Sequence, residues 1–120
     1  MASREPLVRL RHGTTRQRAE AILRDGPNPN FREPGGSDTA EGFSTARLTG
    51  PYPYGSPEDM AIRKDRLFPK EGGPVLLEVE VPATIVRQAD LEGEVRFEFG
   101  FGLKELLAAW PSLAKRILPL

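Results

Sequence analysis

Three short stretches of this sequence carry side chains that could bind or act on a small molecule. His12-Gly13-Thr14 places an imidazole beside a glycine, whose backbone a ligand can approach closely. Ser44 and Thr45 follow a long stretch rich in glycine and proline. Glu92-Gly93-Glu94 supplies two carboxylates separated by one residue. A carboxylate that is held in place can stabilise positive charge that develops in a transition state.

The composition excludes several kinds of chemistry. The 120 residues include no cysteine and one histidine, so a disulfide scaffold, a cysteine-ligated cluster, a thiol nucleophile and a histidine-rich metal site are excluded, and we expect no metal. Lys and Arg number 17 and Asp and Glu also number 17, which argues against binding nucleic acid by bulk charge. No apolar run of about 18 residues and no apolar leader is present, which predicts a cytoplasmic protein without a membrane partner.

The elements that must position these residues form one domain over residues 1–120, a usual size for a single core. Leu7–Arg11 predicts a first strand, and His12–Thr14 is then the turn into a helix over Thr15–Asp25. Thr14 and Gln17 have the spacing of a capping box, and Gly26-Pro27 ends the helix. Tight glycine turns and helix N-termini present backbone N–H groups to anions, so this turn is a candidate binding site.

The rest of the chain alternates loops with short elements and predicts an α+β fold with a small mixed or antiparallel sheet and flanking helices. Residues 26–41 form a long loop. The expected elements are a short strand at Gly42–Ala46, a helix capped by Ser56 and running to about Leu67, a strand at Pro74–Pro82, a short strand including Ile85 and Val86, a strand at Glu94–Phe99, a helix at Leu103–Trp110 and a last helical turn ending near Leu118.

Charge is segregated along the chain although it sums to zero. Residues 1–32 carry seven arginines against three acidic residues, whereas residues 71–105 carry eight acidic residues against three basic ones. Two interpretations stay open. These segments pair across the fold, or the basic segment lines a positive cleft for an anionic ligand.

The order of the three stretches resembles the ADP-ribosyltransferase-like fold of the diphtheria-toxin and PARP type. In that family a His-Gly-Thr sequence ends the first core strand and is followed by a helix of the form A-x-x-I-x-x-x-G. Here His12-Gly13-Thr14 is followed by Ala19, Ile22 and Gly26. A glycine-aromatic-hydroxyl strand, an apolar strand and a late glutamate at the head of a strand follow in the family's order. The resemblance covers roughly Leu7 to Phe99.

The resemblance implies a split sheet with NAD in the cleft between its halves. His12 is similar in position to the histidine that bonds the adenosine ribose, and Gly13 and Thr14 would contact the nicotinamide amide through their backbone. Glu94 would hold the nicotinamide ribose and stabilise the cationic transition state as nicotinamide leaves. Glu92 would orient an acceptor, an unknown protein or nucleic acid that receives ADP-ribose.

The chain combines features of two branches of that family. Where one branch stacks a tyrosine on nicotinamide, this sequence has Ser44, which leaves Tyr52 and Tyr54 in the next loop as candidates for the stacking ring. Ser44-Thr45 and the Glu-x-Glu pattern are similar to the other branch, which has an arginine in place of the histidine. Two alternatives stay open: a non-catalytic nucleotide- or protein-binding module on the same fold, and an RNA 2′-phosphotransferase-like enzyme. A Glu94 carboxylate that did not face His12 across the cleft would favour the binding module.

Overall fold

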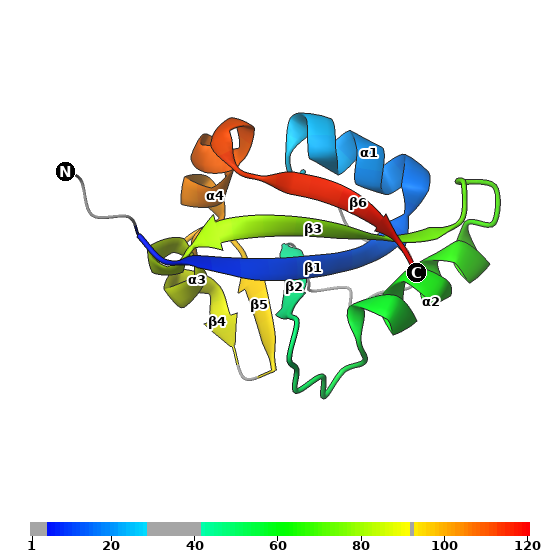
Figure 1. Cartoon of the computed structure of the whole chain (residues 1–120), viewed down its shortest axis with the longest axis horizontal. Coiled ribbons are helices and arrows are strands. Elements are labelled where there is room, and N and C mark those ends of the chain that lie inside the picture. The colour runs from blue at the N-terminus through cyan, green and yellow to red at the C-terminus, as the bar shows by residue number, and fades with distance from the viewer. Residues whose placement is uncertain (1–4, 29–41, 92) are drawn as a thin grey trace.

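The computed structural model describes residues 5–28, 42–91 and 93–120. They form a six-stranded antiparallel sheet with helices packed on it, an α+β domain (Figure 1). Glu92 and residues 29–41 of the predicted long loop lie outside the described residues. The elements in chain order are β1 (Leu7–Thr15), α1 (Arg16–Asp25), β2 (Phe43–Arg47), α2 (Pro57–Leu67), β3 (Pro74–Pro82), α3 (Ala83–Ala89), β4 (Asp90–Leu91), β5 (Glu94–Phe97), α4 (Leu103–Ala109), a single 3₁₀ turn (Trp110–Ser112) and β6 (Lys115–Pro119).

The strand order is β4-β5-β2-β1-β3-β6, so β1 and β3 lie in the interior of the sheet. The prediction for β3 is confirmed with its bounds. It pairs with β1 on one side, from Leu7↔Pro82 to Thr15↔Pro74, and with β6 on the other. Its apolar side chains are buried on both faces, as expected for an interior strand.

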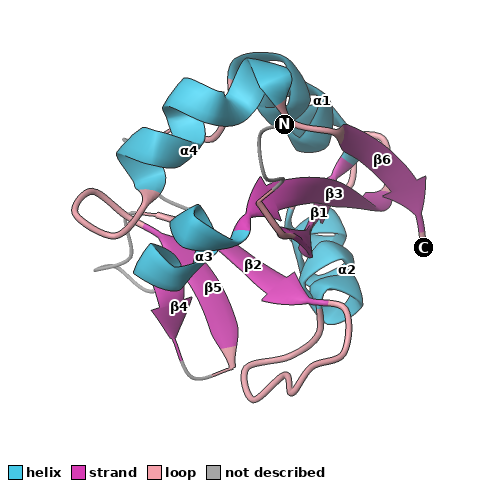
Figure 2. Ribbon diagram, turned by 60° about the vertical axis from the view of Figure 1, so that its left-hand side comes forward, coloured by secondary structure: helices cyan, strands magenta, loops and turns pink. Residues whose placement is uncertain are grey.

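The sheet divides between β1 and β2. Within the described residues, Leu10↔Arg47 and Arg11↔Ala46 are the partner pairs that join these strands. Beyond them, β1 continues alongside β3, whereas Phe43–Thr45 of β2 pair with β5. Figure 2 shows the result, with β2, β4 and β5 grouped apart from β1, β3 and β6. This fork places the end of β1 opposite the start of β2.

Two expectations at the first motif are wrong. His12–Thr14 is not a turn, because β1 stays paired with β3 through Thr15. The Thr14–Gln17 capping box does not form, because Thr15 is the N-cap of α1 and its side chain makes no capping bond. Instead, the backbone N–H groups of Arg16 and Gln17 donate to the carbonyls of Gly73 and Glu71. The β1–β3 pairing, together with the segment 71–73 that precedes β3, therefore determines where α1 begins.

The C-terminal third also differs from prediction in three elements. Ile85 and Val86 belong to α3, in which Ala89 completes a buried helical face rather than a strand. Residues 115–119 form β6 at the sheet edge instead of a helical turn, because their backbone pairs with β3. Strand β5 ends at Phe97, and the turn that follows leaves Phe99 and Phe101 61% and 55% exposed.

The hydrophobic core lies between one face of the sheet and α3 and α4, with α1 packed at its margin. Trp110 is an anchor of this core, because its ring meets Phe43 edge-on and its Nε1 donates to the carbonyl of Leu23. Thirteen buried residues form the cluster: Leu10, Phe43, Leu77, Val79, Val81, Ile85, Val86, Ala89, Val95, Phe97, Leu103, Leu106 and Trp110.

Helix α2 is positioned by strong local signals and by one glycine. Ser56 is the N-cap as expected and forms a reciprocal capping box with Asp59, and Pro57 occupies the first turn. A Cβ at Gly13 of β1 would lie 1.8 Å from the carbonyl oxygen of Pro57 and 2.8 Å from the backbone nitrogen of Ala61. Only glycine therefore permits α2 to lie with its backbone directly against β1.

Candidate functional site

A cavity of about 960 Å³ opens at the fork of the sheet. Its walls come from the end of β1, the start of β2, one side of α1, the inner side of α2 and the head of β5. The volume is at the upper end of the range of about 300–1,000 Å³ for small-molecule sites. The cavity is thus large enough for a ligand of dinucleotide size.

His12 stands at the point where β1 leaves β2. Its Nδ1–H donates to the carbonyl oxygen of Ser44 at 2.7 Å, which fixes the tautomer because a carbonyl can only accept. Its Nε2 faces the ammonium of Lys64 at 3.4 Å, and its ring lies 4.6 Å from that of Phe43. Burial, aided by the charge of Lys64, lowers the pKa of His12 to about 3. The imidazole is therefore neutral at neutral pH.

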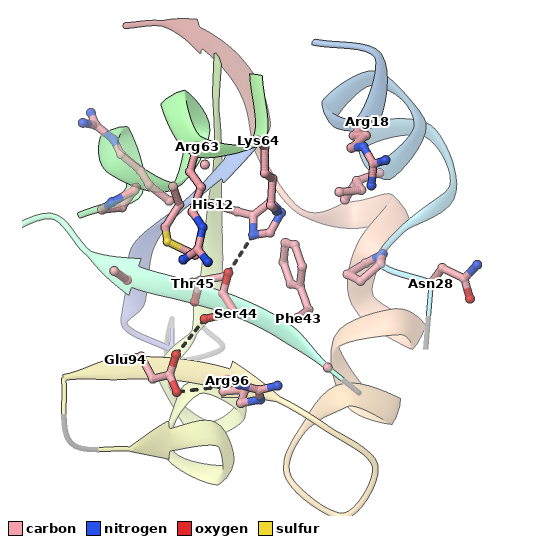
Figure 3. Close-up of a pocket in the computed structure, with 18 of the residues that line it drawn as sticks. His12, Arg18, Asn28, Phe43, Ser44, Thr45, Arg63, Lys64, Glu94 and Arg96 are labelled. Carbon is pink, nitrogen blue, oxygen red and sulfur yellow. Dashed lines mark hydrogen bonds and ion pairs between the residues drawn. The ribbon is translucent and has the colours of Figure 1, made fainter. Parts of the chain in front are cut away.

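Glu94 lies across the fork from His12, and Ser44 joins the two (Figure 3). The Ser44 hydroxyl donates to Oε2 of Glu94 at 2.7 Å, while the Ser44 carbonyl accepts from His12. Arg96 lies 4.0 Å from the other carboxylate oxygen and is itself held by Glu98 at 2.7 Å. The hydrogen bond from Ser44 thus holds the carboxylate at the wall of the cavity, with Arg96 at the outer limit of ion-pair distance on its other side.

The structure brings further predicted residues to this cavity. Gly13, Thr45 and Tyr54 line it, together with His12, Ser44 and Glu94. The Thr45 hydroxyl donates to the carbonyl of Val95 at 2.7 Å and is buried, so it ties β2 to β5. Tyr54 is 75% exposed, with its ring open to solvent. Of the two tyrosines named as stacking candidates, Tyr54 is therefore the one at the cavity.

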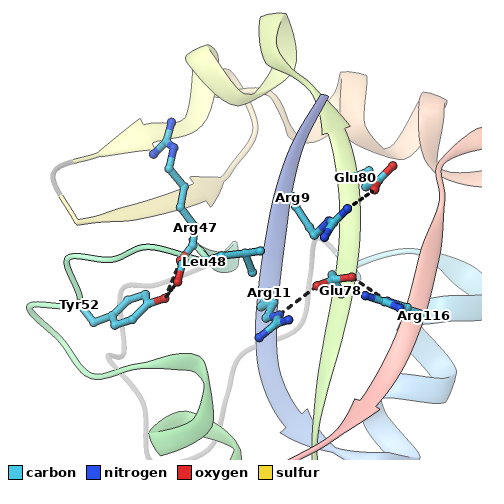
Figure 4. A network of polar contacts seen from close by, with 8 residues as sticks. All are labelled: Arg9, Arg11, Arg47, Leu48, Tyr52, Glu78, Glu80 and Arg116. Carbon is cyan, nitrogen blue, oxygen red and sulfur yellow. Dashed lines mark hydrogen bonds and ion pairs between the residues drawn. The ribbon is translucent and has the colours of Figure 1, made fainter. Parts of the chain in front are cut away.

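Thr14 and Tyr52 are not among the lining residues. Thr14 is fully buried and its hydroxyl has no hydrogen-bond partner. The Tyr52 hydroxyl donates to the carbonyls of Arg47 and Leu48 at 2.7 and 2.8 Å, which fastens the loop after β2 (Figure 4). Tyr52 thus has a structural contact, whereas Glu92 lies in the part of the chain that is not described.

The cavity also contains residues that the sequence motifs did not single out. Lys64 belongs to the basic run Arg63-Lys64-Arg66, a pattern typical of a solvated helix face, yet it is only 7% exposed. Arg18 of α1 lies 4.0 Å from the ring centre of Phe68 and donates to Glu71 at 2.8 Å. The signal for Lys64 is its spacing, because the buried residues Pro57, Ala61 and Lys64 follow a helical i, i+4, i+7 pattern.

The lining is more basic than acidic. Among the residues described, five Arg and Lys side chains line the cavity against three Asp and Glu side chains. Of the acidic ones, Glu71 accepts hydrogen bonds from Arg18 and Thr15, and these bonds lower its pKa. Two of the five cations, Arg11 and Arg96, pair with Glu78 and Glu98 beyond the lining. The ion pairs Arg9–Glu80, Arg11–Glu78 and Arg18–Glu71 join the basic residues 1–32 to the acidic residues 71–105, as the first interpretation of the segregated charge expects. The lining also includes Arg63 and Lys64 of α2, and such cations favour an anionic ligand.

Within residues 5–28, 42–91 and 93–120, no three His, Cys, Asp or Glu side chains gather in a way that could hold a metal ion. The described helices include none that is long and apolar enough to cross a membrane. Comparison of the chain with protein-family models, with curated proteins and with solved structures finds no match in any of the three. The function of the cavity is therefore inferred from its own chemistry.

Proposed function

We propose that this chain has an ADP-ribosyltransferase-like fold, cleaves NAD at the bond between nicotinamide and ribose, and transfers ADP-ribose to an acceptor. The observation that carries the proposal is the link through Ser44, which bonds to both His12 and Glu94 and brings the two to one cavity. The sequence resemblance assigns Glu94 to the transition state and places His12 at the same cleft. The fork between β1 and β2 supplies the cleft that this function needs.

The chemistry of the reaction suits these groups. As the C–N bond breaks, its electron pair leaves with the nicotinamide nitrogen, and positive charge develops on the ribose. The fixed carboxylate of Glu94 is available to stabilise that charge, and its hydrogen bond from Ser44 sets its orientation in advance. The acceptor then adds to the ribose carbon and loses its proton. No metal and no covalent enzyme intermediate is required.

The remainder of the cavity supports NAD as the ligand. Its basic lining favours the two phosphates, and Tyr54 offers an exposed ring at the same cavity as Glu94 for the planar nicotinamide. A binding module without catalysis would also use the cavity and its charge, but it gives no reason for a carboxylate that Ser44 holds at the cavity wall.

The decisive measurement is nicotinamide release from NAD, with water as the acceptor, by the wild type and Glu94→Gln. We expect Glu94→Gln to lower turnover by about a hundredfold or more, because Gln keeps the shape but lacks the charge that the transition state needs. The dissociation constant for NAD should change by less than about threefold, because ground-state binding does not depend on that charge.

Glu80→Gln is the matched control. Glu80 pairs with Arg9 at 3.2 Å and does not line the cavity. Its variant should release nicotinamide at the wild-type rate. Turnover that survives in Glu94→Gln would contradict the assigned role of this carboxylate. A wild type that binds NAD without cleaving it would establish the binding module instead.

A further inference from the structure

Lys64 occupies a position where a helix normally buries an apolar residue. It is the third member of the stripe that α2 buries, after Pro57 and Ala61, and it is 7% exposed. Lysine is seldom buried to this degree unless its ammonium meets polar groups. At the cavity wall, the ammonium lies at the Nε2 atom of His12.

The closeness of α2 to β1 determines where this ammonium lies. The backbone of α2 contacts β1 at Gly13, the residue next to His12. Ala61 is held at that contact, and Lys64 follows it by about one helical turn. In Figure 3 the side chain of Lys64 descends from α2 toward the ring of His12, and Arg63 descends beside it. The sequence pair Arg63-Lys64 thus brings two cations into the cavity.

His12 acts on Lys64 as a fixed acceptor. Its Nδ1–H is committed to Ser44, so the single lone pair of the ring is on Nε2 and faces the ammonium. The ring is neutral and accepts one of the three N–H bonds of Lys64, so this contact orients the ammonium. Both ring nitrogens are therefore engaged within the protein. The group that this wall directs toward a ligand is the ammonium rather than the imidazole.

We propose that Lys64, oriented by His12, binds a phosphate group of the ligand in this cavity. His12 is then a positioning residue, and Lys64 with the adjacent Arg63 forms the phosphate subsite. A phosphate oxygen can accept a charge-assisted hydrogen bond from the ammonium, which is stronger than a neutral one. This assignment rests on the proposed function in that the diphosphate of NAD is the expected group, but it is tested without NAD cleavage.

Calorimetric titration of the wild type, Lys64→Met and Lys70→Met with ADP, inorganic pyrophosphate and adenosine tests the phosphate subsite. Met keeps the length of the buried stem and removes the charge. Lys70 is an exposed lysine outside the cavity, so Lys70→Met is the matched control. We expect Lys64→Met to weaken binding of ADP by about tenfold or more, the loss typical of one charged hydrogen bond, and to leave adenosine affinity unchanged.

The other probe separates the sources of the phosphate. Pyrophosphate that binds in a Lys64-dependent way shows a subsite for free phosphates, whereas Lys64-dependent binding of ADP alone shows that the nucleoside is needed as well. Equal affinity of wild type and Lys64→Met for ADP, an equal loss for adenosine, or no wild-type binding of ADP would each overturn the proposal.

The role of His12 has its own readout, because the chain contains one histidine and its imidazole ¹⁵N signals need no assignment. We expect the Nδ1–H tautomer in the free protein and a shift of the Nε2 signal when ADP binds, since the ammonium then shares its N–H bonds with phosphate. In Lys64→Met, ADP should leave that signal unmoved. An Nε2 signal that responds to ADP equally in both proteins would show that the ligand contacts His12 directly and would overturn the positioning role.

The two proposals fail separately. Lys64-dependent binding of ADP by a protein that releases no nicotinamide would leave the phosphate subsite in place and refute the transferase. Nicotinamide release with an unchanged KM for NAD in Lys64→Met would support the transferase and refute the phosphate subsite.

Discussion

Two charged side chains are buried beside the β1–β3 pair, Glu78 of β3 and Lys64 of α2, and their surroundings differ. On the outer face, Glu78 of β3 is 4% exposed and uses both carboxylate oxygens, accepting from Arg11 at 3.0 Å and from Arg116 at 2.7 Å (Figure 4). At the fork, Lys64 is nearly as buried, yet it faces a neutral imidazole at the wall of a cavity.

The comparison separates a structural ion-pair network at Glu78 from a candidate ligand site at the fork. Burial raises the pKa of Glu78, but the hydrogen bonds from Arg116 and Arg11 outweigh it and hold the pKa below its ordinary value. Opposite charges on three neighbouring strands thus complete one another, and the network fastens β1, β3 and β6. At the fork, His12, Lys64 and Glu94 line a cavity instead, where a buried ionisable group with a perturbed neighbour is a mark of a ligand site.

The largest expected effect comes from moving the wall of the cavity while leaving the outer network intact. Gly13→Ala would place a Cβ against the backbone of α2, which cannot yield as a side-chain tip can. We expect a loss of about 3 kcal/mol or more in the free energy of unfolding, measured by urea denaturation.

Gly73→Ala separates this contact from ordinary glycine strain. Gly73 has a positive φ of 90° but no atom within 4 Å of an added Cβ. It should cost about 1 kcal/mol, the price of a left-handed backbone alone. Equal losses for the two variants would contradict the close docking of α2.

An intermediate effect is the pH dependence of stability, in which His12 and Glu78 act in different pH ranges. The folded-state pKa of His12 is about 3 against an ordinary 6.5, so the unfolded chain takes up a proton that the folded chain refuses. Stability should therefore fall as the pH falls from 6.5 toward 3, by about 2 kcal/mol between pH 7 and pH 5. Denaturation curves for the wild type and His12→Gln across this range measure it.

The outer face responds in a lower window. The pKa of Glu78 is lowered from 4.5, so its contribution is complete above that value and is lost as the pH falls through the folded-state pKa. Glu78→Gln should flatten the stability profile below about pH 4.5 and leave the drop between pH 7 and pH 5 in place. A wild-type profile that is flat between pH 7 and pH 5 would show that His12 accepts a proton in the folded protein.

The smallest expected effect is that of Ser44→Ala. The bond from His12 uses the Ser44 backbone and survives, so only the hydrogen bond to Glu94 is lost. Stability should fall by about 1 kcal/mol at most, whereas nicotinamide release should fall by about tenfold because the carboxylate loses its orientation. Ser112→Ala, in the exposed turn before β6, is the control and should change neither. Unchanged release in Ser44→Ala would show that Arg96 alone positions Glu94.

Elements with local signals could be predicted from the sequence, and those that depend on distant partners could not. The alternating apolar residues of β3 and the Ser56 cap of α2 are local signals that need no distant partner. Both elements therefore form where the sequence predicts them. Strand β6 forms because its backbone pairs with the edge of β3. No pattern within residues 115–119 indicates that pairing. The spacing of the buried residues Ile85, Val86 and Ala89 favours a helix. The adjacent β-branched residues Ile85 and Val86, taken alone, favour the strand that the sequence predicts.

The same division holds for the candidate site. His12 and Glu94 could be named from motif order, and the structure places both at one cavity. Lys64 was missed because a run of basic residues usually marks a solvated face, and only the contact of α2 with Gly13 turns that face inward. Tyr52 and Tyr54 were indistinguishable in the sequence, because the loop geometry that directs one hydroxyl to backbone carbonyls is a tertiary property.

The interior position of β1 also bears on the order in which the chain can fold. Strand β1 precedes its partners in the chain, because it pairs with β2 at residues 46–47 and with β3 at residues 74–82, and β3 itself is flanked by β6 at residues 115–119. Each pairing closes a long loop before any contact rewards it, which slows folding of such topologies. During synthesis, β1 and with it one wall of the cavity would thus lack its partner β3 until residues 74–82 had been added to the chain.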